Sequence, residues 1–153
     1  MEVAVHSRLG SGVNAGLQRF IKRAQKEIGL RGSVSVLLTT NKEMRALNRR
    51  FRKQDKPTDV LSFPAAGGAQ AGSLGDIAIS AGIARAQAQR FGHTLQQELN
   101  ILVLHGLLHL AGYDHEHDNG KMHRIERRLR SKLALPDSLT ERGAERSSQS
   151  QQP

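Results

Sequence analysis

The sequence contains no cysteine. Disulfide bonds and thiolate metal ligands are therefore excluded, and any transition-metal site must be built from His, Asp or Glu. The absence of cysteine also fits a reducing compartment such as the cytosol. No apolar run approaches the roughly 18 residues that a membrane-spanning helix needs, and the N-terminal residues lack the basic-then-apolar layout of a signal peptide. We therefore expect a soluble, cytoplasmic protein without a membrane partner.

Aromatic residues are scarce as well, at 3% of the chain, which argues against a surface on which nucleobases stack. Hydrophobic residues reach only 37%, and part of that deficit lies at the polar C-terminal end. A chain of 153 residues suits one compact domain. We expect one folded domain over residues 1–135 and a polar, mostly disordered tail over residues 136–153.

Positive charge is in excess, with a formal net charge of +9. Much of it lies in two short stretches, each opposed by a single acidic residue, Asp55 in the first and Glu126 in the second. The basic residues are Arg45, Arg49, Arg50, Arg52, Lys53 and Lys56, and then Lys121, Arg124, Arg127, Arg128, Arg130 and Lys132. Clustering favours a binding surface for a polyanion, nucleic acid first, over a merely solubilising surface. Such binding would rest on phosphate contacts and weaken steeply with salt.

Hydrophobic periodicity and capping signals predict an alternation of strands and helices. The second helix should bury a stripe made of Met44, Leu47 and Phe51. The expected order is strand–helix–strand–helix–strand–strand–helix–helix–helix, which indicates an α/β domain with a small mixed sheet of about four strands flanked by about five helices. The strand order stays open. We place strands at residues 2–6, 33–38, 60–63 and 75–79, a loop at 65–73, and helices at 14–28, 40–51, 80–91, 94–110 and 118–133.

Histidines form the most informative pattern, in the segment LHGLLHLAGYDH that ends at His115. His105 and His109 are four residues apart, so their side chains lie one above the other on a helix face. Gly112 can take a positive φ and turn the chain, which lets His115 return to the same point. A single histidine on an apolar helix is more often a satisfied core residue. Three at this spacing predict a catalytic site for one zinc ion with an open fourth position.

The same histidine spacing occurs in metzincin metalloproteases, which place a glutamate directly after the first histidine as the general base. Here that position is Gly106, which counts against peptide hydrolysis. Asp114 is the nearest carboxylate, and it is as readily a turn residue or helix cap as a partner that orients an imidazole. His117 and His123 are expected at the surface or behind the metal ligands.

The basic segment NRRFRKQDKPTDVLSFP offers cations for a phosphodiester substrate. A guanidinium beside a metal site can bind the non-bridging phosphate oxygens and stabilise charge in the transition state. Spacing alone does not choose among Arg49, Arg50 and Arg52. Asp59 could support the site or simply stabilise a turn.

Three blocks resemble one known family. HGLLHLAGYDH is similar to the histidine signature of the bacterial YbeY endoribonucleases, and PTDVLSFP and LGDIAIS are similar to that family's two other recurrent blocks. The likeness covers residues 30–133. It implies a zinc-dependent, single-strand-specific endoribonuclease that acts in ribosomal RNA processing, including the small-subunit 16S rRNA, and in ribosome quality control. It also implies that His105, His109 and His115 bind the zinc, and that Arg52 is the functional arginine.

Our leading hypothesis is therefore a metal-dependent hydrolase whose catalytic residues are Arg52, His105, His109 and His115. Its cofactor is one Zn²⁺ and its partner is RNA, as rRNA, the ribosome or the small ribosomal subunit; DNA is not expected. Two alternatives stay open, a zinc peptidase or amidase and a non-catalytic rRNA-binding assembly factor with a structural zinc. The sequence also leaves open whether water or the substrate's own 2′-OH is the nucleophile.

Overall fold

The computed structural model describes residues 3–7, 9–55, 58–66, 72–114 and 118–136. Within them the strands are β1 (Val3–His6), β2 (Ser33–Thr39), β3 (Val60–Pro64) and β4 (Ser73–Ser80). The helices are α1 (Ser11–Ile28), α2 (Asn41–Arg52), α3 (Ala81–Phe91), α4 (Leu95–Leu110) and α5 (Lys121–Lys132). The predicted order and the predicted α/β class are confirmed. The expected tail lies almost wholly outside the described residues.

The boundaries differ from the predictions by a few residues. Helix α1 begins at Ser11, three residues before Asn14, where we expected it to begin. Strand β4 begins at Ser73, inside the stretch that we expected to be a loop. Helix α5 begins at Lys121, after the N-cap Gly120, whereas Asp118, our expected start, lies before the helix and accepts a hydrogen bond from the Met122 N–H. Such differences are common, because the sequence pattern identifies a helix more reliably than it identifies the residue at which the helix begins.

The four strands form one mixed sheet in the order β1-β2-β4-β3. Strands β1, β2 and β4 run parallel, so that Val36 lies between Val5 and Ile77. Strand β3 is antiparallel to β4 and forms one edge of the sheet, with Ser62 opposite Ile77. Pro64 ends this edge strand, where a missing N–H does little harm. The edge position of β3 leaves one side of its backbone open to side chains from elsewhere.

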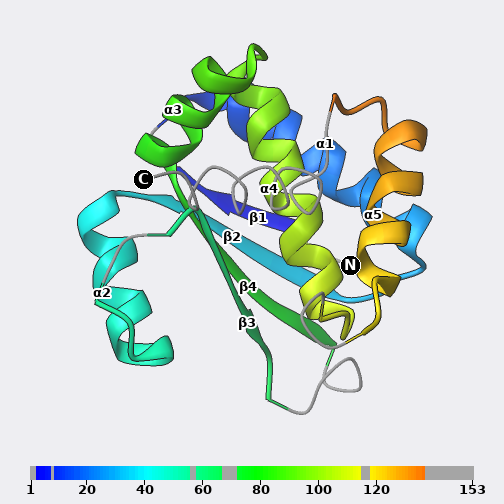
Figure 1. The fold of residues 1–153 in the computed structure, drawn as a ribbon, viewed down its shortest axis with the longest axis horizontal. Coiled ribbons are helices and arrows are strands. Elements are labelled where there is room, and N and C mark those ends of the chain that lie inside the picture. Colours follow the sequence, from blue (N-terminus) through cyan, green and yellow to red (C-terminus); the bar gives the residue numbers. More distant parts are fainter. Residues whose placement is uncertain (1–2, 8, 56–57, 67–71, 115–117, 137–153) are drawn as a thin grey trace, which may run out of the picture.

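Helices cover the two faces of the sheet unequally (Figure 1). Helix α4 crosses one face together with α1, and α5 packs alongside α4. The main core lies there, and every residue of α4 from Glu98 to Leu108 is buried except Asn100. Helix α2 lies over the opposite face, on a small second cluster of Met44, Leu61 and Ala78. No helix in the described ranges is long and apolar enough to span a bilayer.

Capping side chains set the starts of three helices as predicted. The hydroxyls of Thr40, Ser80 and Thr94 accept hydrogen bonds from the backbone N–H groups three residues later. At Thr94 the reciprocal bond from Gln97 completes a capping box. At α2 the carboxylate of Glu43 instead accepts a hydrogen bond from the hydroxyl of Thr39. This bond ties the end of β2 directly to the first turn of α2.

The predicted buried stripe of α2 is wrong at one position. Met44 is fully buried and Leu47 is partly buried, but Phe51 is 53% exposed. The reason is the small size of the second cluster: β3 is the last strand of the sheet, and Phe51 itself packs there against the ring of Phe63. A helical period identifies a face, whereas the extent of the partner surface decides how much of that face is covered.

Gly75 offers a test of how β3 is held against β4. Its φ is +137°, and a Cβ built there would lie 2.2 Å from the carbonyl oxygen of Phe63. We expect Gly75→Ala to lower the free energy of unfolding by about 2 kcal/mol or more, through backbone strain and the clash. Gly12→Ala is the matched control because a Cβ at that helical position meets nothing within 4 Å. Equal stability of the two variants in urea denaturation would contradict this account of the β3–β4 contact.

Candidate active site

Helix α4 brings two of the three predicted ligands together. The Nε2 atoms of His105 and His109 lie 3.1 Å apart, and the ring centroids are separated by 4.7 Å. His105 is buried and His109 is half-buried. The i, i+4 spacing on one helix therefore makes the two Nε2 atoms converge on one point, as the sequence pattern predicts. His115 lies outside the described residues.

A carboxylate from α5 fixes the first imidazole. Oε1 of the fully buried Glu126 lies 3.0 Å from Nδ1 of His105. Because a carboxylate accepts hydrogen bonds, the network assigns the proton of His105 to Nδ1 and leaves a lone pair on Nε2. A carboxylate–histidine pair of this kind is the usual support of a metal-binding imidazole. The chemistry of the donors therefore fits a metal ion at the point where the two Nε2 atoms meet.

We had interpreted Glu126 only as a countercharge within a basic stretch. A usable signal was its place on the helix, four residues after Met122 and three before Leu129, which are both buried. A carboxylate on the apolar face of a helix must find a buried partner. That position, read together with an imidazole predicted on a neighbouring helix, could have identified the pair.

The spacing of the two imidazoles can be compared with that of a zinc site. Zinc–nitrogen bonds of about 2.0–2.1 Å at a tetrahedral angle place two ligand nitrogens about 3.3–3.4 Å apart. The observed 3.1 Å is close to this value. Among the described residues no group of three or more metal-ligating side chains gathers. The structure thus describes two donors of the predicted set, and the third stays a prediction.

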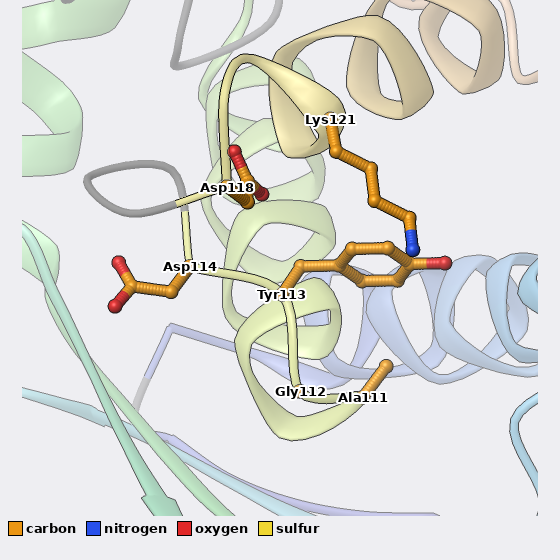
Figure 2. Close-up of a pocket in the computed structure, with 6 residues that line it drawn as sticks. All are labelled: Ala111, Gly112, Tyr113, Asp114, Asp118 and Lys121. Carbon is orange, nitrogen blue, oxygen red and sulfur yellow. The ribbon is translucent and has the colours of Figure 1, made fainter.

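The chain is anchored on both sides of the undescribed residues 115–117. Gly112 has a φ of +100° and ends α4, as expected, and the Tyr113 N–H bonds to the Leu108 carbonyl. Figure 2 shows a pocket between the end of α4 and the start of α5. Lys121 reaches over Tyr113 there, and Asp114 points away from both. The Lys121 ammonium lies 5.5 Å from the Tyr113 ring centroid. Asp114 is exposed, and its role stays a prediction. His123 is half-buried on α5.

Arg52 is the arginine of α2 that hydrogen bonds link to α4. Its Nη2 donates to the backbone carbonyl of Ser62 at 3.1 Å. The Ser62 hydroxyl in turn donates to the carbonyl of Gly106 at 3.2 Å, one residue after His105. Two hydrogen bonds therefore connect Arg52 to the turn of α4 that carries His105. Among the described residues, the other arginines of α2 make no such connection, and two of them, Arg45 and Arg49, face Asp55 instead.

Asp55 engages two of those other arginines. Arg45 lies 2.9 Å from its carboxylate and Arg49 lies 3.9 Å away. The hydrogen bond from Arg45, with the charges of both arginines, lowers the pKa of the Asp55 carboxyl below its usual value. Asp59 binds backbone groups, because its Oδ1 accepts from the Val60 N–H and its carbonyl accepts from the Ser80 N–H. These backbone contacts fit the turn-stabilising alternative for Asp59.

Gly106 faces the sheet at very short range. A Cβ there would lie 3.1 Å from two carbon atoms of Ile77 and 3.2 Å from the Ser62 hydroxyl. A carboxylate side chain at the position that supplies the general base in metzincins would therefore have to push these neighbours aside. The glycine also allows α4 to approach β3 and β4 closely, which brings the histidines and Arg52 to the same region.

A second buried polar group lies at the other end of α4. The Nε2 of His93 is 2.7 Å from Oε1 of Glu98, whose Oε2 accepts from Gln87 at 2.7 Å. The sequence carries no pattern that marks His93 as functional. Glu98 is seven residues before His105, so this group lies about 10 Å along the helix from the paired imidazoles. Its contacts join α3 to α4, which is a structural role.

Comparison with known proteins gives a consistent result. The family model described as "Endoribonuclease YbeY" matches residues 5–134. Endoribonuclease YbeY of Koribacter versatilis is 52% identical over 140 residues, covering 92% of this chain and 90% of that protein. The protein of the same name from Solibacter usitatus is 54% identical over 126 residues, covering 82% and 83%. The solution structure of TM1509 from Thermotoga maritima is similar with a TM-score of 0.63 at 30% identity, covering 100% and 97%.

The close approach at Gly106 can be tested by substitution. Gly106→Glu forces a carboxylate against Ile77 in the core, so we expect the free energy of unfolding to fall by roughly 3 kcal/mol or more. Gly82→Glu is a suitable control, since a Cβ at that position meets its nearest atom at 3.6 Å, on the side chain of Asn41. Thermal denaturation followed by circular dichroism measures both. A Gly106→Glu protein that melts like the control would show that position 106 has space for a general base.

Proposed function

The chain belongs to the YbeY family of endoribonucleases, and we propose that it is a single-strand-specific, zinc-dependent endoribonuclease acting in ribosomal RNA maturation. The observation that carries this proposal is the convergence of two Nε2 atoms 3.1 Å apart, one of them on an imidazole bound to a buried carboxylate. We further propose that the 16S rRNA of the small subunit is a substrate and that the activity serves ribosome quality control in the cytoplasm.

In this proposal His105, His109 and His115 hold one zinc ion. When bound, the metal acts as a Lewis acid that lowers the pKa of a bound water to about 7 and polarises a phosphoryl oxygen. Glu126 keeps the proton on Nδ1 of His105 and stops the ring from rotating. The same carboxylate raises the basicity of the ligand nitrogen. Half-burial of His109 leaves the metal position accessible from one side.

Arg52 is the residue proposed to bind the scissile phosphate. Its guanidinium is planar, carries several donors and stays charged at any relevant pH, which suits two non-bridging phosphate oxygens. One of its N–H groups is used on Ser62, which holds the side chain at the edge of β3 and leaves other donors available. Prepositioned in this way, the cation stabilises the charge that builds up in the transition state.

The basic residues of α2 and α5 would guide RNA to this site. Asp55 offsets Arg45 and part of the charge of Arg49. Arg50 and Lys53 have no acidic partner within the part of the chain that the structure describes. This unneutralised charge lies in the last turn of α2, beside Arg52, and favours a polyanionic strand there.

The peptidase alternative lacks its expected general base, because residue 106 is a glycine whose surroundings at Ile77 and Ser62 are already tight. A purely structural zinc is disfavoured by the half-exposed His109, since structural sites are closed by four protein ligands. The endoribonuclease is therefore the function that the site supports best.

The first test is the metal dependence of cleavage. We expect the purified protein to contain about one zinc per chain and His109→Ala to lose both the metal and the cleavage of single-stranded RNA. His6→Ala is the control, because His6 is exposed at the end of β1. Metal analysis and an RNA-cleavage assay on the same preparations decide the matter. A metal-free His109→Ala protein that still cleaves would refute the proposal.

The second test concerns Glu126. Glu126→Gln keeps the shape of the side chain but removes the charge that supports His105, so we expect zinc affinity to fall by about 10- to 100-fold. Glu27→Gln is the matched control, since Glu27 pairs with Lys132 at an exposed position. Competition with a chromophoric chelator measures both affinities. Identical affinities for the two variants would mean that Glu126 does not act on the metal site.

A further inference from the structure

We propose that Phe51, together with Phe63 and Arg50, forms a stacking site for one unpaired nucleobase of the RNA strand whose phosphate is bound by Arg52. The proposal rests on the proposed function, because it assumes that single-stranded RNA binds at Arg52. It adds a position at which the base itself is recognised, and a physical reason for preferring single strands.

The first observation is the exposure of an aromatic ring. Phe51 is 53% exposed, and among the described residues Leu37, at 40%, is the one other large hydrophobic side chain that is exposed. The ring of Phe63 contacts Phe51 in an edge arrangement, with centroids 5.2 Å apart and an interplanar angle of 66°. Phe63 is half-buried against the small second cluster. Phe51 thus packs against Phe63 on one side, while about half of its side chain is exposed to solvent.

The second observation is the charge around that ring. The guanidinium carbon of Arg50 lies 5.1 Å from the Phe51 centroid, and Lys53 follows in the chain. An apolar protein partner would have to bury these cations without compensation. A nucleotide offers both a π face for the ring and a phosphate for the cations, and an arginine plane can itself stack on a base. Charge complementarity therefore selects RNA as the occupant.

The third observation is the location of the ring. Phe51 precedes Arg52 on α2, and Phe63 follows Ser62 on β3, while Arg52 and Ser62 are hydrogen-bonded to each other at 3.1 Å. The aromatic pair therefore lies directly beside the Arg52–Ser62 contact on both segments. A strand with a phosphate at Arg52 brings a neighbouring base to Phe51.

Stacking on Phe51 requires a base that is free to leave its own stack. Bases in a duplex are paired and stacked on each other, and extracting one costs a few kcal/mol. Stacking also tolerates any base, since each has a π face. The site therefore selects for single strands without selecting a sequence. Our expectation that scarce aromatics exclude base stacking is revised to this extent: one exposed ring is enough for one base.

The direct experiment uses Phe51→Trp, which introduces the sole tryptophan because the chain has none. The probes are a fluorescein-labelled single-stranded 12-nucleotide oligouridylate and an abasic sugar-phosphate strand of equal length. We expect the oligouridylate to quench the tryptophan emission in a saturable manner and the abasic strand to leave it unchanged. Fluorescein anisotropy measures binding independently. RNA binding without quenching would overturn the stacking site.

Affinity measurements on further variants complete the test. We expect Phe51→Ala and Phe51→Leu to bind the oligouridylate at least about fivefold more weakly, and Phe51→Tyr to bind it as wild type does. Binding of the abasic strand should not respond to any of these changes. Leu37→Ala, an exposed apolar side chain outside the basic segment, should bind within about twofold of wild type. Wild-type affinity in Phe51→Leu refutes the stacking site alone, whereas a wild-type protein that neither binds nor cleaves RNA refutes the proposed function as well.

Discussion

The arrangement of this molecule depends on the burial of imidazoles in an apolar helix. A buried imidazole that lacks a partner costs free energy, and α4 carries His105 within a run of buried apolar residues. Glu126 satisfies its Nδ1, and Nε2 is directed at His109. Glu126 can do this because Met122 and Leu129 dock α5 against the main core. The geometry of the site therefore depends on the packing of the core. A change in how α5 packs against α4 would move Glu126 and the His105 imidazole with it.

The sheet edge supplies the other half of the site. Gly106 permits α4 to lie directly on Ile77 and Ser62, and Ser62 is hydrogen-bonded on one side to α4 and on the other to Arg52. The antiparallel edge strand β3 thus joins a helix on each face of the sheet. Its exposed edge, the arginines of α2 and the ring of Phe51 follow one another along a single path. Its positive charge favours a polyanionic strand as the partner.

Much of the fold could be predicted from the sequence because its signals are local. Thr40, Ser80 and Thr94 cap helices, and Gly29 and Gly92 end them in left-handed conformations. The strand order could not be predicted, since it depends on contacts between distant segments. The same limit explains Phe51, which the helical period assigned to the core although β3, the strand that it contacts, is the last of the sheet and leaves 53% of the side chain exposed. The roles of Glu126 and Glu98 could not be predicted for a related reason, because Glu126 pairs with His105 of another helix and Glu98 binds Gln87 of α3.

The central claim is that the converging imidazoles bind a metal ion with one position left for substrate or water. Anomalous diffraction at the zinc edge, from crystals of the protein grown with zinc, tests it most directly. The account predicts one strong peak about 2.0–2.1 Å from Nε2 of His105 and of His109, completed by His115 and by a fourth ligand that is not protein. A peak at a different place, or a zinc closed by four protein side chains, would contradict it.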